Sequence, residues 1–215
     1  MREITINDFL NISRKKGYKI FYGGRGINLN IWGIRSNDKN SNSFNDKICA
    51  FWKDIDADKW HLIQFDATTD PGLYWRNNPM NQLGTAILKP GQYEGCWKIG
   101  KHKGYEALVQ DKPVVVYRDN NRDNILDIEN TNVGIHAGVF GINIHRANSN
   151  GKSVQVDRWS AGCQVLQNRK RNHAVNGAEF QYDWDFFMHL VRSSASFYNE
   201  YFTYTLIDES DLFDK

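Results

Sequence analysis

The sequence has few of the features that mark several common protein classes. It contains three cysteines and four prolines in 215 residues, and no apolar run approaches the roughly 18 residues of a membrane-spanning helix. Three widely spaced thiols do not form a disulfide framework. We therefore expect a protein made in a reducing compartment, with no transmembrane segment, in which each thiol needs its own explanation.

An excess of charge of one sign is also missing. Lys+Arg 27 and Asp+Glu 25 give a formal net charge of +2, so we expect no nucleic-acid partner held through phosphate contacts. Aromatic residues make up 13% of the chain, too many for a disordered protein. The N-terminus lacks the basic flank and apolar core of a signal peptide. The composition predicts a folded protein synthesised in the cytoplasm without a signal peptide, and it leaves the oligomeric state open.

Short apolar runs with a period of two residues dominate the sequence, separated by Gly, Asn and Asp at expected turns. Two longer segments, 5–16 and 179–192, carry apolar residues at helical spacing. The pattern predicts a mainly β (β-rich α+β) fold with a few peripheral helices. The predicted strands are residues 18–22, 29–32, 48–52, 60–65, 85–88, 114–117, 141–145 and 201–207.

A histidine and a cysteine 18 residues apart carry the most distinctive chemistry. His145 ends a predicted strand, and Cys163 follows the small-residue sequence Ser-Ala-Gly at 160–162. A thiolate is a strong nucleophile, and a nearby imidazole can take the proton from the thiol. Gly162 permits a bend that turns backbone N–H groups toward a developing oxyanion. This arrangement predicts nucleophilic thiol catalysis.

These residues resemble a known catalytic signature. His145, the step to Cys163 and the Ser-x-Gly-Cys sequence are similar to the motif of the L,D-transpeptidase (YkuD-like) family, and residues 84–93 are similar to the strand-turn-strand before its catalytic half. The resemblance implies an L,D-transpeptidase-like β-sandwich or barrel. It covers roughly residues 60–207, so we expect a catalytic domain at 60–215 and an N-terminal β-rich extension, 1–59, packed on it.

The resemblance implies a role for each residue of the motif. Cys163 would attack the carbonyl of an L,D-linked stem peptide of peptidoglycan or a muropeptide, with His145 as base and then acid. The carbonyl of Arg146 would orient the imidazole, and the N–H groups of Ala161, Gly162 and Cys163 would build the oxyanion hole. The thioester would then be resolved by water or by an amine, which leaves hydrolysis and transfer both open. We expect neither a cofactor nor a metal ion.

Further residues are candidates for contact with the substrate. His136 lies nine residues before His145, where it would either face the same cleft across a hairpin or be an ordinary strand-end histidine. His102 is expected at a hairpin tip, in solvent or at the mouth of the cleft. The predicted substrate-binding residues are Ser160, Trp159 and His136.

The motif departs from the family pattern at three positions. Ala161 stands where the family has a second histidine, Gln164 where it has a hydrophobic residue, and Val165 where it has an arginine. The strings Gly-Ile-Asn-Ile-His-Arg-Ala and Trp-Ser-Ala-Gly-Cys-Gln-Val are similar to a bacteriophage and prophage branch of lytic enzymes (endolysins). That branch implies action on the cell wall after lysis, through a holin or specialised export, or as part of a virion.

Two other interpretations stay open. The first is a catalytically weak wall-binding or virion-associated module of the same fold, with Ala161 and Val165 as signs of decay, although the intact His145 and Cys163 argue against it. A papain-like peptidase would place the cysteine before the histidine, as Cys96 and His145 do, although Cys49 and Cys96 both lie in apolar contexts typical of core residues. The Asp-x-Asn-x-Asp run at 119–123 is better explained as a turn than as a calcium loop, because it lacks the required glycine and final carboxylate.

Overall fold

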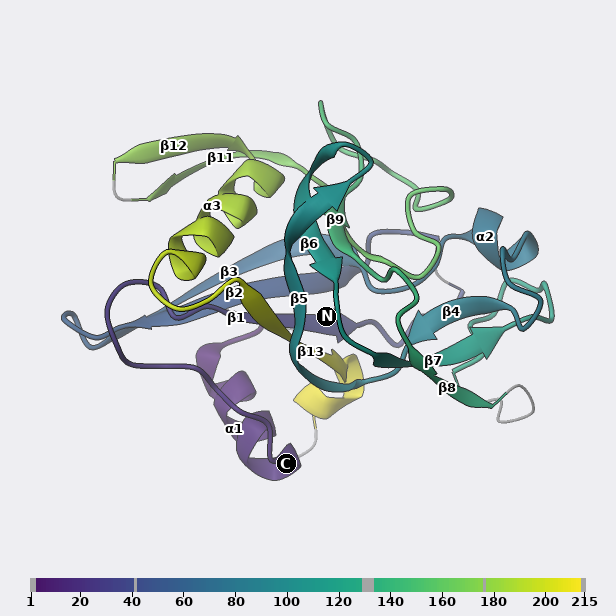
Figure 1. The fold of residues 1–215 in the computed structure, drawn as a ribbon, viewed down its shortest axis with the longest axis horizontal. Helices are drawn as coiled ribbons and strands as arrows, with labels where there is room; N and C mark the ends of the chain where they lie inside the picture. The colour runs from purple at the N-terminus through teal and green to yellow at the C-terminus, as the bar shows by residue number, and fades with distance from the viewer. Residues whose placement is uncertain (1–2, 41, 129–133, 176, 214–215) are drawn as a thin grey trace.

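The protein is built around a closed barrel of eight strands (Figure 1). The computed structural model describes residues 3–40, 42–128, 134–175 and 177–213. Neighbouring barrel strands are antiparallel, except for two parallel pairs, β1 with β13 and β9 with β10. In order around the barrel the strands are β1 (Asn30–Arg35), β13 (Tyr201–Asp208), β5 (Gly91–His102), β6 (Tyr105–Gln110), β9 (Ile144–Arg146), β10 (Gln164–Leu166), β3 (Lys59–Thr68) and β2 (Asp46–Asp54).

The barrel and one long helix share the main hydrophobic core. The helix α3 (Asp183–Ala195) lies along the barrel (Figure 1) and buries Trp184 and Phe187 in the same cluster as Phe65 and Trp97. Removal of these large aromatic faces from water favours this docking. The predicted mainly β architecture with peripheral helices is therefore confirmed.

Smaller elements surround the barrel. A three-stranded sheet contains β4 (Thr85–Leu88), β7 (Val114–Asp119) and β8 (Ile135–Gly138), and a hairpin contains β11 (Lys170–Val175) and β12 (Ala178–Tyr182). The remaining elements are α1 (Ile6–Lys16), α2 (Leu73–Asn77) and the 3₁₀ helix η1 (Glu209–Leu212). None of the helices in the described ranges is both long and apolar enough to cross a membrane.

Residues 1–59 contribute to the barrel wall. The strands β1 and β2 lie between β13 and β3 in the barrel, and α1 buries Phe9 against Trp32 of β1 and Phe51 of β2. The strands on the two sides of the predicted boundary at residue 60 therefore belong to one closed sheet.

Three sequence predictions of local structure are wrong in whole or in part. The strand expected at 141–145 is confined to Ile144–Arg146 (β9), and the Ile142 N–H donates to the Gln110 side chain instead of to a neighbouring strand. Residues 18–22 form no strand, because side-chain amides take the place of a neighbouring strand: Asn30 bonds both the N–H and the C=O of Phe21, and Gln92 does the same for Lys19. The helix expected at 179–192 begins only at Asp183, because residues 178–182 pair with β11 as the strand β12.

Candidate active site

Pairing between β9 and β10 brings His145 and Cys163 to the same part of the barrel wall. The parallel register sets Ile144 beside Gln164, and the Gln164 N–H donates to the Asn143 carbonyl at 2.9 Å. Because side chains alternate between the two faces of a sheet, Asn143, His145 and Cys163 share one face. The fold thus gathers residues that are 18 positions apart in sequence.

The buried imidazole of His145 has a defined orientation. Its Nδ1 lies 2.8 Å from the Arg146 carbonyl and 3.2 Å from the Tyr105 hydroxyl, which itself donates to that carbonyl at 3.1 Å. Since only a protonated Nδ1 can donate to a carbonyl, the free lone pair of the neutral ring lies on Nε2. Nε2 is buried and has no hydrogen-bond partner among the described residues. An unpartnered basic nitrogen is therefore held on the face that carries Cys163.

A second histidine covers the first. The rings of His102 and His145 stack with centroids 4.0 Å apart, and the Asn143 side-chain amide donates to His102 Nδ1 at 3.0 Å. Burial, and next the charge that His102 would carry, lower the pKa of His145 to about 3. His145 is consequently neutral at physiological pH, so its Nε2 is free to accept a proton from a neighbouring group.

The Cys163 thiol is half-buried and protonated. Its Sγ donates to the Gly141 carbonyl at 3.5 Å, so the thiol hydrogen bond runs to Gly141 and not to His145. Burial raises the pKa of Cys163 to about 11, although a backbone hydrogen bond from Asn143 acts in the opposite direction. The pair is thus a neutral thiol beside a neutral imidazole, not a preformed thiolate–imidazolium ion pair.

The turn before the thiol depends on Gly162. Its φ is +118°, and a Cβ at this position would lie 2.5 Å from the Ala86 carbonyl oxygen. The Ser160 hydroxyl donates to the Cys163 carbonyl at 2.8 Å and accepts from the Gly162 N–H at 3.2 Å. Within the described chain, the N–H groups of Ala161 and Cys163 have no acceptor, so these two amides are the available oxyanion donors.

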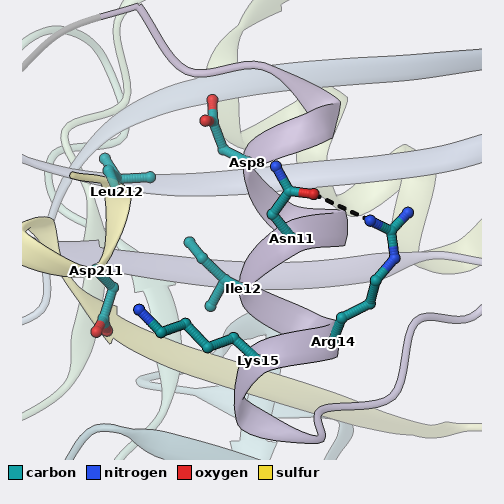
Figure 2. A pocket seen from close by; sticks show the side chains of 7 residues that line it. All are labelled: Asp8, Asn11, Ile12, Arg14, Lys15, Asp211 and Leu212. Carbon is teal, nitrogen blue, oxygen red and sulfur yellow. Dashed lines mark hydrogen bonds between the residues drawn. The ribbon is translucent and has the colours of Figure 1, made fainter. Parts of the chain in front are cut away.

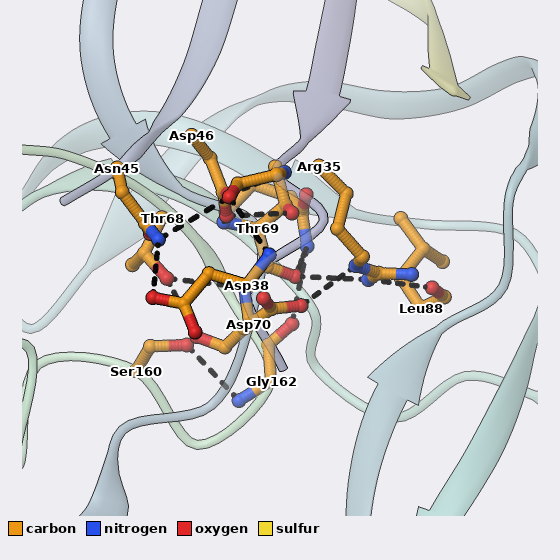
Figure 3. Close-up of polar contacts among 12 residues, drawn as sticks. Arg35, Asp38, Asn45, Asp46, Thr68, Thr69, Asp70, Leu88, Ser160 and Gly162 are labelled. Carbon is orange, nitrogen blue, oxygen red and sulfur yellow. Dashed lines mark hydrogen bonds and ion pairs between the residues drawn. The ribbon is translucent and has the colours of Figure 1, made fainter. Parts of the chain in front are cut away.

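A buried polar network fixes this turn to the barrel, and Figure 3 shows its contacts between Asp46 and Thr69 and between Ser160 and Gly162. The Gln164 amide donates to the carbonyls of Thr69 and Gly162, and its oxygen accepts from the Tyr204 hydroxyl. The Thr69 N–H and hydroxyl both donate to Asp46, whose pKa burial raises to about 7. Gln164 therefore positions the turn at 160–163 that carries Cys163.

A pocket of about 330 Å³ adjoins the turn on the Ala161 side. Its wall is of mixed polarity, and Arg118 is the one charged residue among the described residues that line it. Ala161 belongs to the turn at 160–163, so this pocket opens beside the candidate oxyanion donors. Its lining residues are Trp75, Met80, Asn81, Gly84, Thr85, Ala86, Arg118, Val139, Phe140 and Ala161.

The remaining predicted site residues lie as follows. Trp159 is 39% exposed at the surface, whereas Ser160 is fully buried beneath the turn. His136 lies on β8 opposite Val116, in a different sheet from His145, and it does not line the pocket beside Ala161. The expectation that a hairpin places His136 across from His145 is therefore wrong, because β8 pairs with β7 and β9 pairs with β6 and β10.

Several residues of the site were missed or misread from the sequence. His102, expected in solvent or at the mouth of the cleft, packs on His145. Tyr105 reaches the site from β6, which pairs with β9, and Arg118 from β7 in the three-stranded sheet, whereas Asn143 lies two residues before His145. Asp119, the first residue of the calcium-like run, forms a buried ion pair with Arg76 at 3.1 Å.

The other two thiols have surroundings unlike that of Cys163. Cys49 is fully buried, and burial raises its pKa to about 12. The Cys96 thiol donates to the backbone carbonyls of Glu94 and Pro113, and burial raises its pKa as well. Neither contact involves an imidazole, so the geometry gives no support to a papain-like pair of Cys96 and His145.

A second hollow, of about 450 Å³, lies between α1 and η1 (Figure 2). Its lining includes Asp8, Arg14 and Asp211, and Arg14 donates to the neighbouring Asn11 at 3.1 Å. It shares no residue with the Cys163 site and offers no cysteine or histidine among its lining residues.

No protein-family model, curated protein or solved structure matches this chain.

Proposed function

We propose that the protein is a cysteine enzyme of the L,D-transpeptidase type that acts on peptidoglycan stem peptides. One observation carries the proposal: the unpartnered Nε2 of a neutral, oriented His145 lies on the same barrel face as Cys163, and the turn before Cys163 leaves two N–H groups free. A general base, a nucleophile and oxyanion donors are the three requirements of acyl transfer through a thioester.

The neutral pair defines the chemical step. Rotation about the Cys163 Cα–Cβ bond releases Sγ from Gly141 and turns it toward Nε2. His145 takes the thiol proton as sulfur attacks the peptide carbonyl, and the Ala161 and Cys163 N–H groups stabilise the oxyanion. Collapse of this intermediate expels the leaving amine, which receives the proton from His145 and leaves the acyl group on sulfur. Water or an acceptor amine then releases the acyl group by the same steps in reverse.

Hydrolysis and transfer share this intermediate, so the proposal includes L,D-carboxypeptidase, L,D-endopeptidase and L,D-transpeptidase activity. We further propose that the resemblance to the phage branch indicates cell-wall cleavage. The enzyme would then reach the wall after lysis, through a holin or specialised export, or on a virion.

A second candidate function is a wall-binding or virion-associated module of the same fold. The observation that favours it is the thiol itself, which is protonated and bonded to Gly141 instead of His145. Such a module would bind muropeptides without changing their mass, which separates it from the enzyme in one assay.

The test uses a synthetic stem tetrapeptide that ends in D-Ala after an L-configured residue, incubated with the protein and excess D-methionine. Both reactions release D-Ala; formation of the free tripeptide acid reports hydrolysis, and incorporation of D-methionine in place of D-Ala reports transfer. The Cys163→Ala variant should abolish both products, whereas the matched Cys96→Ala variant should retain them. Undiminished turnover by Cys163→Ala would refute the proposed nucleophile, and loss with Cys96→Ala alone would assign the reaction to Cys96.

A further inference from the structure

Arg118 is a buried arginine that lacks a carboxylate partner. The structure buries three arginine side chains in the described chain, and two of them have ion-pair partners: Arg35 with Asp70 at 2.7 Å, and Arg76 with Asp119 at 3.1 Å. Arg118 is 6% exposed and forms no ion pair with any described residue. Of the three buried arginines in the described chain, it is thus the one without an ion-pair partner.

The local contacts hold the guanidinium without neutralising it. Its Nη1 donates to the Gly84 carbonyl at 3.1 Å, its plane lies over the Phe140 ring with Cζ 4.8 Å from the centroid, and Nε has no partner among the described residues. Burial lowers the pKa of Arg118, and no carboxylate raises it. A buried cation without a counter-charge is costly, so a bound anion would stabilise this region.

The pocket around Arg118 has the character of a binding site for a small carboxylate. Trp75, Phe140 and Ala86 supply apolar wall, and the charged group stands among them as the sole ionic feature of the described lining. A guanidinium presents N–H groups in a planar fork that matches the two oxygens of a carboxylate. Burial of the guanidinium, which is 6% exposed, strengthens such a pair.

This pocket adjoins the candidate nucleophile through two segments of chain. Ala161, which lines it, lies two residues before Cys163, and Gly162 packs against the Ala86 backbone. On the other side, Phe140 precedes Gly141, whose carbonyl accepts the hydrogen bond of the Cys163 thiol. Cys163 itself does not line the pocket, but a ligand anchored at Arg118 would lie beside the turn at 160–163 that carries the thiol and the free amides.

We propose that this pocket binds the carboxylate of a peptide substrate, with Arg118 as its counter-charge, and so orients the scissile carbonyl toward Cys163. The inference rests on the proposed function for the identity of the peptide, but the binding itself does not require turnover. Arg118 would supply the positive charge that the motif lacks at Val165. The carboxylate is either the C-terminal one of D-Ala or the side-chain one of a diaminopimelate residue.

Calorimetric titration of the inactive Cys163→Ala protein tests the inference with two pairs of peptides. The first pair is a lysine-containing stem tetrapeptide with a free or an amidated C-terminus. The second pair carries lysine or diaminopimelate at the third position, both amidated at the C-terminus. In one of the two pairs, we expect the peptide with the additional free carboxylate to bind about tenfold or more tightly than the peptide without it. The peptide without this carboxylate cannot form the charge-assisted hydrogen bonds.

Variants assign the preference to Arg118. Adding Arg118→Gln to the Cys163→Ala protein should remove the preference for the carboxylate, and Arg118→Lys should retain part of it. The matched Arg192→Gln variant removes the same charge from a half-exposed pair with Glu106 and should leave the preference unchanged. If Arg118→Gln does not fold, as judged by circular dichroism, the acid–amide comparison and Arg118→Lys still decide the question.

The outcomes separate this inference from the proposed function. Equal binding within both peptide pairs, or a preference that persists in a folded Arg118→Gln variant, would overturn the carboxylate site even if the wild-type enzyme turns over its substrate. An Arg118-dependent preference in a protein without L,D activity would support the site and refute the proposed reaction.

Discussion

The imidazole rings of His102 and His145 lie face to face, with centroids 4.0 Å apart and planes inclined by 12°. They come from β5 and β9, which β6 separates in the barrel. The stack shields His145 from water on one side, and Arg146 holds its Nδ1 on another. Together with burial, this arrangement keeps the His145 ring neutral and leaves the lone pair on its Nε2 available.

The neutral state of His145 predicts a pH dependence of stability. The folded pKa of about 3 lies below the ordinary value of 6.5, so the unfolded chain binds a proton that the folded protein excludes. The associated stability is complete above pH 6.5 and is lost as the pH falls toward 3. In urea unfolding measurements, the free energy of unfolding should fall less steeply between pH 7 and pH 4 for His145→Gln than for wild type. The difference in slope should reach up to about 1.4 kcal/mol per pH unit. Identical slopes in the two proteins would contradict a buried, neutral His145.

The protonated thiol predicts how Cys163 reacts in the free protein. With a pKa of about 11, its thiolate fraction rises about tenfold per pH unit below that value. The rate of iodoacetamide labelling at Cys163, followed by peptide mass spectrometry, should therefore climb from pH 6 to 10 without a plateau. A plateau beginning near pH 5 would indicate a thiolate–imidazolium pair and would contradict the neutral pair described above.

Tyr105 acts as a positioning residue for His145. Its hydroxyl donates to the Arg146 carbonyl at 3.1 Å and lies 3.2 Å from Nδ1. Tyr105→Phe should lower kcat by about three- to tenfold, less than the 10²–10⁴ that a whole general base contributes, with KM unchanged. The control is Tyr93→Phe, which removes a hydroxyl that donates to the Lys89 carbonyl outside the site and should leave kcat intact. An equal effect of both variants would indicate a purely structural role.

Gly162 is required by both its backbone conformation and its neighbour. Gly162→Ala should lower the free energy of unfolding by about 1–3 kcal/mol from strain at positive φ, with a further loss because the new Cβ meets the Ala86 carbonyl. Gly177→Ala is the matched control, since Gly177 also has positive φ (+79°) but nothing within 4 Å of the added carbon. Chemical denaturation should rank Gly162→Ala as clearly more destabilising, and the reverse order would argue against close packing of the turn.

The sequence predicted those parts of the fold whose pattern is local. The strand at 85–88 was predicted with the observed limits, and the helix at 6–16 to within a residue, because period and capping residues are read directly from the chain. The strand expected at 18–22 failed because Asn30 and Gln92, distant in sequence, satisfy its backbone. Side-chain amides that satisfy a backbone in place of a neighbouring strand leave no pattern in the local sequence.

The same distinction applies to the site. His145 and Cys163 were recognised from their own neighbours in sequence, whereas Tyr105 and Arg118 belong to it only because barrel closure and the β4–β7–β8 sheet bring them there. Neither residue has a distinctive sequence context. An arginine without a counter-charge becomes visible only when the partners of every buried charge are known.

The central claim is that Cys163 performs acyl chemistry on L,D-linked stem peptides. The most direct test is mass spectrometry of purified muropeptides after incubation with wild-type protein or with Cys163→Ala. We predict that wild type removes D-Ala from tetrapeptide stems, exchanges it or joins stems through the L-centre, and that Cys163→Ala leaves every mass unchanged. Muropeptides unchanged by folded wild-type protein, or changed equally by the variant, would contradict the claim.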